Sequence, residues 1–328
     1  MPRMYQKAWE AKGRRVAVHV DDAEACEVKS TKLVGTRGPY YRRIRPQGEQ
    51  SDDTEDSLSR IESKASFSLR QLVAGQPLEL ERKGIVAQLL AVQIVRGPAF
   101  FQQREEIIRP PLEAAMADNF KPQGLASVGG DVNVARRKAI AAELDPTTRF
   151  LTMLAYARKI ASVLGLMRWQ ILRFDAPVLA YSDHPVVLWP LEIEASQPLQ
   201  RQSLGPVETL EIRVPIAPDA AILMNWLDLS DAVGIQMPAS AAAELNAFTI
   251  SQAEKEWMHQ PGSEPEVGKG VFKPLSRLID SSYGKQTVVG STRHALAAQF
   301  FKRVQGRKFV NDVEVLVEMG AASTQSAA

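Results

Sequence analysis

A stretch of fourteen residues at 177–190, PVLAYSDHPVVLWP, limits the fold more tightly than any other part of the sequence. Two short apolar runs in it are separated by a polar segment and a proline. The polar segment consists of Ser182, Asp183 and His184. Short apolar runs bounded by turn residues are typical of buried strands. The stretch therefore predicts two short buried strands joined by a polar corner, with mainly helical sequence before it and much sheet-forming sequence after it.

Composition is that of an ordinary globular protein. The chain has 328 residues, of which 45% are hydrophobic and 24% charged. Cys26 is the only cysteine, which excludes a disulfide framework or a cysteine-based zinc site within one chain and favours a reducing compartment. No apolar run approaches the roughly 20 residues that cross a bilayer, and the N-terminus is a poor signal peptide. We therefore expect a soluble cytoplasmic protein with no membrane partner.

The first strands are expected near the N-terminus. Residues 14–20, RRVAVHV, alternate polar and apolar side chains, and this period of two predicts a strand. Residues 31–45 predict a second, weaker strand pair, broken at Gly35 and Gly38. His19 lies inside the first strand, where a histidine is more often an ordinary sheet residue than a metal ligand. A small N-terminal sheet follows from these patterns.

Amphipathic segments predict the helical part of the chain. The first helix runs from about 53 to 74 and stops at the Gly-Gln-Pro sequence of 75–77. A second helix follows at 79–97, and the short connection makes the two neighbours antiparallel. The longest helix is predicted at 148–173, where Trp169 is expected to anchor the packing because tryptophan buries a large area.

The C-terminal half predicts a small, mostly antiparallel sheet. Residues 207–216 and 219–227 read as strands, and Pro215 suggests the end of a strand or a sheet edge. Helices are expected at 238–258 and 290–305.

These patterns predict an α+β fold with a small N-terminal β-sheet, a central helical bundle and a mostly antiparallel C-terminal sheet capped by a helix. The corresponding boundaries are an N-terminal β segment at 1–50, a helical region at 51–175, a sheet with C-terminal helices at 176–320 and a disordered tail at 321–328. No long linker separates the three folded regions, so we expect one compact unit.

Positive charge is concentrated near the N-terminus. Residues 1–45 hold eleven Lys or Arg and five Asp or Glu, although the net charge of the whole chain is only +2. The densest segment is YYRRIR at 40–45, in which Arg42 and Arg43 are candidates for contacting a substrate. Arginines interleaved with aromatic residues can pair with phosphates and stack on bases. The other interpretation is a strand with a solvated basic edge that discourages aggregation.

Several short segments resemble one family when they are taken in order. They are Pro2-Arg3-Met4-Tyr5 with Ala8-Trp9, the helix and turn from Glu62 to Pro77, the Gln93, Arg96 and Pro98 pattern, Trp169 followed by Ser182-Asp183-His184-Pro185, the segment from Pro215 to Pro218, and Leu245-Asn246. Over residues 2–260 the chain resembles the bacterial domain-of-unknown-function family DUF4238. It departs from the family pattern in having Gln6 after Tyr5, where leucine is usual, and in lacking histidines before that segment. The resemblance implies fold organisation and no settled activity.

Two familiar chemistries fit the polar positions poorly. Adjacent strand residues point to opposite faces, so Ser182, Asp183 and His184 cannot form a catalytic triad among themselves. The four histidines show no H-x-x-x-H or H-E-x-x-H spacing, which argues against a histidine-based metal site. Magnesium held by carboxylates stays open, because it needs only one or two of them.

A metal-dependent nuclease is the remaining catalytic hypothesis. Such sites place an acid on one strand and an acid-x-Lys pair on the next, and Asp183 followed by Glu211 and Arg213 fits this arrangement loosely. Arg96 is a candidate partner for Asp183, either as a fold lock or as a pocket wall. The alternatives are that Glu211 and Arg213 form an exposed polar stripe, and that Asp183 pins the corner by accepting backbone N–H groups.

Two functions from different classes follow. The first is an effector that acts on nucleic acid or a nucleotide, as a toxin or in phage defence, with Asp183, Arg96 and Glu211 as catalytic residues and Mg²⁺ as the cofactor if it is a nuclease. Its substrate-binding candidates are Gln93, Ser182, His184, Trp169, Asn246, Arg42 and Arg43. The second is a non-catalytic binding or regulatory protein that uses its helical surface for a protein partner. Substitution of Asp183 by Asn is the simplest test between them.

Overall fold

Two larger β-sheets, one two-stranded sheet and a layer of helices make up the described part of the chain. The computed structural model describes residues 3–20, 26–34, 43–44, 50–51, 53–96, 146–190, 206–227, 229–269, 275, 279 and 292–304. Within these ranges the helices are α1 (Arg3–Gln6), α2 (Asp53–Val73), α3 (Leu80–Val95), α7 (Pro146–Leu166), α8 (Ala239–Ser251) and α10 (Thr292–Val304), with 3₁₀ turns η1 (Lys7–Trp9) and η2 (Pro206–Glu208). The strands are β1 (Arg15–Val20), β2 (Glu27–Ser30), β3 (Arg43–Ile44), β4 (Gln50–Ser51), β5 (Arg168–Arg173), β6 (Ala180–Ser182), β7 (Val187–Pro190), β8 (Thr209–Ala217), β9 (Ala220–Asn225), β10 (Ala232–Gln236) and β11 (Glu256–His259).

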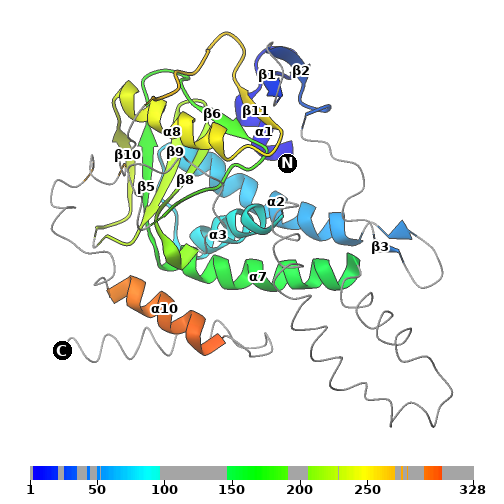
Figure 1. The fold of residues 1–328 in the computed structure, drawn as a ribbon, viewed down its shortest axis with the longest axis vertical. Helices are drawn as coiled ribbons and strands as arrows, with labels where there is room; N and C mark the ends of the chain where they lie inside the picture. The colour runs from blue at the N-terminus through cyan, green and yellow to red at the C-terminus, as the bar shows by residue number, and fades with distance from the viewer. Residues whose placement is uncertain are drawn as a thin grey trace.

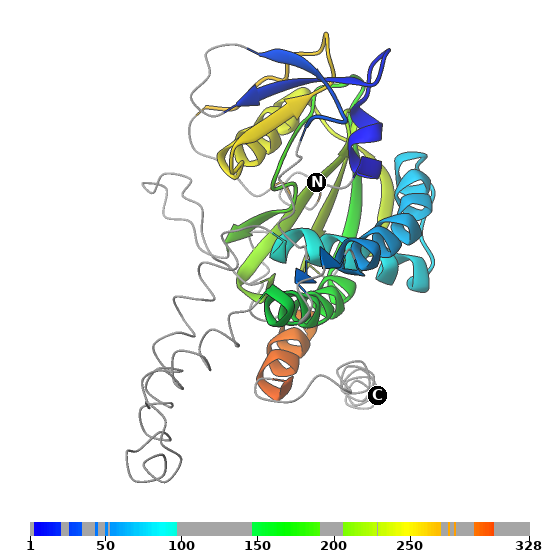
Figure 2. The same cartoon turned by 90° about the vertical axis from the view of Figure 1, so that its right-hand side faces the viewer.

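The N-terminal strands share a sheet with strands from the C-terminal half of the chain. The four-stranded sheet has the order β2-β1-β11-β6 and is antiparallel throughout. The five-stranded sheet has the order β10-β5-β9-β8-β7, and only its β10–β5 pair is parallel. The α+β class and the mostly antiparallel pairing are therefore confirmed, and Figure 2 shows the four-stranded sheet above α8 and the larger sheet below it.

The polar corner connects these two sheets. Its first strand, β6, pairs with β11 in the four-stranded sheet, and its second strand, β7, pairs with β8 in the five-stranded sheet. The prediction of two short buried strands is confirmed, since β6 is buried along its whole length and Val187 and Trp189 of β7 are buried. The corner at 183–186 carries the chain from one sheet to the other.

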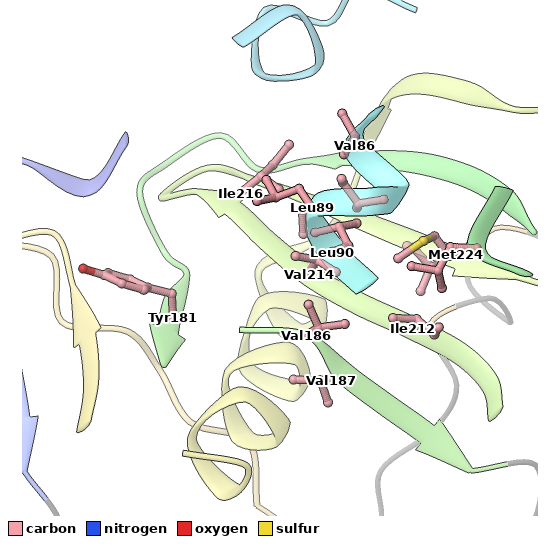
Figure 3. Close-up of a cluster of buried hydrophobic side chains, with 14 of the residues drawn as sticks. Val86, Leu89, Leu90, Tyr181, Val186, Val187, Ile212, Val214, Ile216 and Met224 are labelled. Atoms are coloured by element: carbon pink, nitrogen blue, oxygen red, sulfur yellow. The ribbon is translucent and has the colours of Figure 1, made fainter. Parts of the chain in front are cut away.

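Helix α3 packs against the larger sheet and forms the centre of the core. Its apolar residues Val86, Leu89 and Leu90 point toward β8 and β9, as Figure 3 shows, and all are buried. Helices α2 and α7 lie beside α3 (Figure 1). The predicted first two helices are confirmed. The first ends at Val73 and is followed by Gly75, whose φ of 72° is the left-handed conformation that glycine adopts readily after a helix.

Two predicted elements were wrong in type. The segment MRWQILRF was assigned to the end of the longest helix, but α7 ends at Leu166 and residues 168–173 form strand β5. Similarly, EWMH was assigned to the end of the 238–258 helix and forms β11. The interior of β5 is buried on both faces, so its apolar run lacks the alternation that distinguishes a strand from a helix. Strand β2 at 27–30 was not predicted, and residues 35–42 of the strand pair expected at 31–45 lie outside the described part of the chain.

Several predictions fall outside the described residues. They concern part of the strand pair expected at 31–45 and the tail expected at 321–328. The predicted strands at 207–216 and 219–227 correspond to β8 and β9, and the predicted helix at 290–305 corresponds to α10. Among the helices that the structure describes, none is long and apolar enough to cross a membrane.

Candidate functional site

The carboxylate of Asp183 ties the corner to the turn between α8 and β11. Its Oδ1 atom accepts the backbone N–H of Glu254 at 2.7 Å, and its Oδ2 atom accepts that of Lys255 at 2.9 Å. The adjacent Ser182 hydroxyl donates to the carbonyl of His184 at 2.8 Å. Both carboxylate oxygens of Asp183 thus hold backbone N–H groups, which is the arrangement that the structural interpretation of this residue predicts.

Asn246, another predicted site residue, connects α8 to the strand that enters the corner. Its side chain is fully buried. The Oδ1 atom accepts the N–H of Ala180 at 2.8 Å, and the Nδ2 group donates to the carbonyls of Val178 and Glu266 at 2.8 and 2.9 Å. These three bonds join β6, α8 and the segment after β11, so Asn246 organises the same region as Asp183.

Glu211 and Arg213 form an ion pair in the interior. Both are 0% exposed, so the expectation of an exposed polar stripe was wrong, although the two side chains do share one face of β8. Arg213 donates from Nε and Nη2 to Oε1 of Glu211 at 2.7 and 2.5 Å. The guanidinium lies 3.9 Å from the centre of the Trp189 ring, and the same Glu211 oxygen accepts the N–H of Leu275. The aromatic and backbone contacts compensate for burying the charges.

The other predicted site residues lie in different surroundings. Arg96 forms an ion pair with Glu62 at 3.2 Å, and Gln93 is buried on α3. Trp169 is 3% exposed and donates its indole N–H to the carbonyl of Leu164, which fits its predicted role as a packing anchor. Arg42 and the side chain of Arg43 lie outside the described part of the chain.

Three side chains with metal-binding atoms meet on one face of the four-stranded sheet. They are His19, Cys26 and His259, and their ligand atoms all lie within 4.8 Å of one another. The Nε2 atoms of the two histidines are 3.2 Å apart, and Cys26 Sγ is 3.9 Å from Nε2 of His259. Within the described ranges, no other group of three or more His, Cys, Asp or Glu side chains converges in this way.

Strand pairing explains how residues so distant in sequence come together. Strand β1 pairs antiparallel with β11 and places His19 opposite Trp257. Alternate residues of a strand share a face, so His259 lies on the same face as Trp257 and His19. On its other side β1 pairs with β2, and Cys26 continues that register to the position opposite His19. Three adjacent chain segments therefore each contribute one donor.

Neighbouring groups hold the two imidazoles in orientations suited to binding a metal. The carbonyl of Gln260 lies 2.9 Å from Nδ1 of His259. Because a carbonyl only accepts, Nδ1 carries the proton and the lone pair of Nε2 faces the other donors, as in many metal-binding histidines. The ring of His19 stacks on Trp257 with centroids 3.6 Å apart and planes 4° from parallel. Both rings are fixed before any metal arrives.

The electrostatic environment keeps His19 in its metal-binding form. Burial, and after it the neighbouring His259, lowers the pKa of His19, although Glu264 opposes the change. A lowered pKa favours the neutral imidazole, which is the form that binds metals. Burial also raises the pKa of the Cys26 thiol. A raised pKa favours the protonated thiol. A bound cation would reverse this preference and stabilise the thiolate.

Two of the three donor–donor separations are close to those around a tetrahedral zinc ion. With Zn–N bonds of about 2.0–2.1 Å and Zn–S bonds of about 2.3 Å, tetrahedral angles separate two nitrogens by about 3.3 Å and a nitrogen from a sulfur by about 3.6 Å. The corresponding distances here are 3.2 and 3.9 Å. Imidazole and thiolate donors suit Zn²⁺ and other transition metals, whereas Mg²⁺ prefers oxygen donors.

Sequence spacing missed this cluster because the three donors have no local motif. His19 and His259 are 240 positions apart, and the single cysteine was taken to exclude a cysteine-based zinc site. That inference holds for sites built from several cysteines but not for a mixed one. The sequence feature that pointed to the cluster was a histidine in a sheet-forming segment. It could identify a metal site only if the partner strand were already known.

Fold and cluster together define an α+β protein with two sheets and a candidate transition-metal centre. The chain belongs to the family described as "Protein of unknown function (DUF4238)", whose sequence profile matches residues 1–263. This range contains His19, Cys26 and His259 as well as the Asp183 corner, and it confirms the resemblance found in the sequence. No curated protein and no solved structure shows significant similarity to the chain.

Proposed function

We propose that this protein is a metal-dependent hydrolase whose centre is formed by His19, Cys26 and His259. The observation that carries the proposal is the convergence of three donor atoms within 4.8 Å. Zn²⁺ is the metal that this donor set favours. A Zn²⁺ ion with three protein ligands keeps a position for water, lowers the pKa of that water to about 7 and so supplies a nucleophile at neutral pH.

The position of the cluster supports a catalytic centre over a closed structural one. Cys26 is exposed, and His19 and Trp257 are only partly buried. A substrate can therefore approach the metal position from the outer face of the sheet.

Nucleic acids and nucleotides are the substrate class that we favour. The segment that supplies His19 and Cys26 belongs to the N-terminal 45 residues, in which Lys and Arg outnumber Asp and Glu by eleven to five. This excess attracts phosphate groups over the segment as a whole, while four of its five acids lie at 21–27, beside Cys26. Trp257 adds a partly exposed aromatic ring beside the cluster, the kind of side chain on which bases stack. A role as a toxin or in phage defence would follow from such an activity.

The proposal can be tested with purified protein by measuring metal content and hydrolysis together. We expect close to one zinc per chain, loss of both metal and phosphodiester hydrolysis in His259→Ala, and recovery of activity when Zn²⁺ is added to chelator-treated wild type. His184→Ala removes a histidine outside the cluster and should keep the metal. Hydrolysis that persists unchanged in metal-free protein would overturn the proposal.

The non-catalytic alternative is favoured by a different observation. A metal bound by β1, β11 and Cys26 would fasten the N-terminal strands to the rest of the sheet and could serve stability alone. Exposed apolar side chains on the helices, including Phe67, Leu80 and Leu151, support a protein-binding surface. In that case metal removal lowers the melting temperature, and no hydrolysis accompanies the bound metal.

The magnesium-nuclease hypothesis at Asp183, Arg96 and Glu211 stays a prediction. Its support is the acid at the corner and the acid on the following strand. The hydrogen bonds of Asp183 to two backbone N–H groups and the buried ion pair of Glu211 give both residues a structural role as well. Asp183→Asn separates the roles if folding and activity are measured on the same sample.

A further inference from the structure

A second site is a cavity of about 90 Å³ between the helices and the five-stranded sheet. It is bounded by the end of α2, the turn into α3, strand β5 and the start of β10. Its lining residues are Leu72, Pro77, Leu78, Lys83, Trp169, Ile171, Asp231, Ala232 and Val233. All except Lys83 and Asp231 offer mainly apolar surface, so the cavity is an apolar space with one charged end.

Lys83 gives that end an unused hydrogen-bond donor. Its ammonium group donates to Asp231 Oδ2 at 2.7 Å and to the Met167 carbonyl at 3.1 Å. An ammonium group has three N–H donors, so one has no acceptor among the described residues. The side chain of Lys83 is 9% exposed, which makes solvent a poor substitute. Unfilled donors on buried cations are costly, and a ligand acceptor would remove the cost.

The surrounding charge favours an anionic acceptor. Among the described residues that line the cavity, Asp231 is the only acidic one, and it already accepts from both Lys83 and the N–H of Trp169. Arg168 and Arg293 lie close enough to lower the pKa of Lys83, although burial is the largest cause of that change. Lys83 and Asp231 thus form a charge pair at the polar end of an apolar cavity, and the two arginines add positive charge in its surroundings.

We propose that this cavity binds a short-chain aliphatic carboxylic acid, with its carboxylate on Lys83 and its hydrocarbon chain between Leu78, Trp169 and Ile171. The volume of the cavity limits the length of the ligand's hydrocarbon chain. A dry apolar cavity of about 150 Å³ takes up benzene, and a volume of about 90 Å³ therefore suits an aliphatic body of a few carbons. Apolar walls with one placed charge are the usual construction of small-molecule sites. This inference is independent of the metal centre.

Isothermal titration calorimetry with 3-methylbutanoate tests the proposal. We expect one acid per chain and at least tenfold weaker binding of 3-methylbutanol, which has a similar body without the charge. Lys83→Met should weaken acid binding at least tenfold, and Lys64→Met, which removes an exposed lysine on α2, should leave it unchanged.

If Lys83→Met does not fold, Ala232→Leu provides a second test of the proposal. The substitution fills the cavity without touching the charges, so it should also weaken acid binding at least tenfold. Absence of acid binding to wild type, equal binding of the acid and the alcohol, or undiminished binding to folded Ala232→Leu would each overturn the proposal.

Discussion

The corner region and the His19–Cys26–His259 cluster use polar side chains in opposite ways. Asp183 and Asn246 hold backbone groups, and Glu211 holds Arg213 together with the N–H of Leu275. In the cluster the donor atoms instead point toward one another, with Nε2 atoms 3.2 Å apart. Polar groups that the protein itself satisfies stabilise the fold, whereas converging donors are arranged for a cation that the chain does not supply.

The largest stability effect is expected where the interior ion pair is broken. Arg213→Met leaves the Glu211 carboxylate buried without its guanidinium and should lower the free energy of unfolding by about 3–5 kcal/mol. Urea denaturation measures this change. The double variant Glu211→Gln/Arg213→Met should recover much of the loss because it leaves no buried charge. If the double variant loses as much stability as Arg213→Met, the loss comes from the packing of Arg213 on Trp189 and not from the buried charge.

Asn246→Ala should be the next most severe change. It removes three hydrogen bonds to backbone groups of β6 and of the segment after β11, and we expect a loss of about 2–3 kcal/mol in urea denaturation. Zinc affinity should change little once the protein is folded. A selective loss of zinc at unchanged stability would contradict the assignment of Asn246 to the structural region.

Asp183→Asn separates structure from chemistry at the corner. An amide accepts with only one of its two polar atoms, so the variant should lose about 1–2 kcal/mol of stability and keep its bound metal. Hydrolysis per folded molecule should be close to that of wild type. A folded, metal-loaded but inactive variant would instead revive the catalytic interpretation of Asp183.

The smallest effect is expected at Tyr181, whose buried hydroxyl has no hydrogen-bond partner among the described residues. Tyr181→Phe should change stability at pH 7 by less than about 1 kcal/mol. Burial, followed by Glu256 and Glu10, raises the pKa of Tyr181 in the folded protein. The unfolded chain ionises first as the pH rises above about 10, so wild type should lose stability there. When denaturation is measured at several alkaline pH values, the stability of Tyr181→Phe should decline less steeply with pH than that of wild type.

Local patterns predicted the elements whose apolar residues recur with a clear period in the sequence. The apolar stripe of α2 and the alternation in β1 could be read directly from the sequence. Strands β5 and β11 were misassigned because the burial of a strand depends on its partner strands, and the sequence does not identify those partners. The same limit applies to the sites. The shared face of Glu211 and Arg213 followed from their spacing, but their burial did not, and the convergence of His19 with His259 required the register of β1 on β11.

Cobalt substitution tests the metal centre most directly. When Co²⁺ is added to chelator-treated protein, we predict binding of one ion per chain, visible absorption typical of tetrahedral cobalt and a thiolate-to-cobalt charge-transfer band. The charge-transfer band should disappear in Cys26→Ser, and His19→Ala and His259→Ala should each weaken cobalt binding. Failure of folded wild-type protein to bind Co²⁺, or a spectrum that is identical in Cys26→Ser, would contradict a centre formed by these three residues.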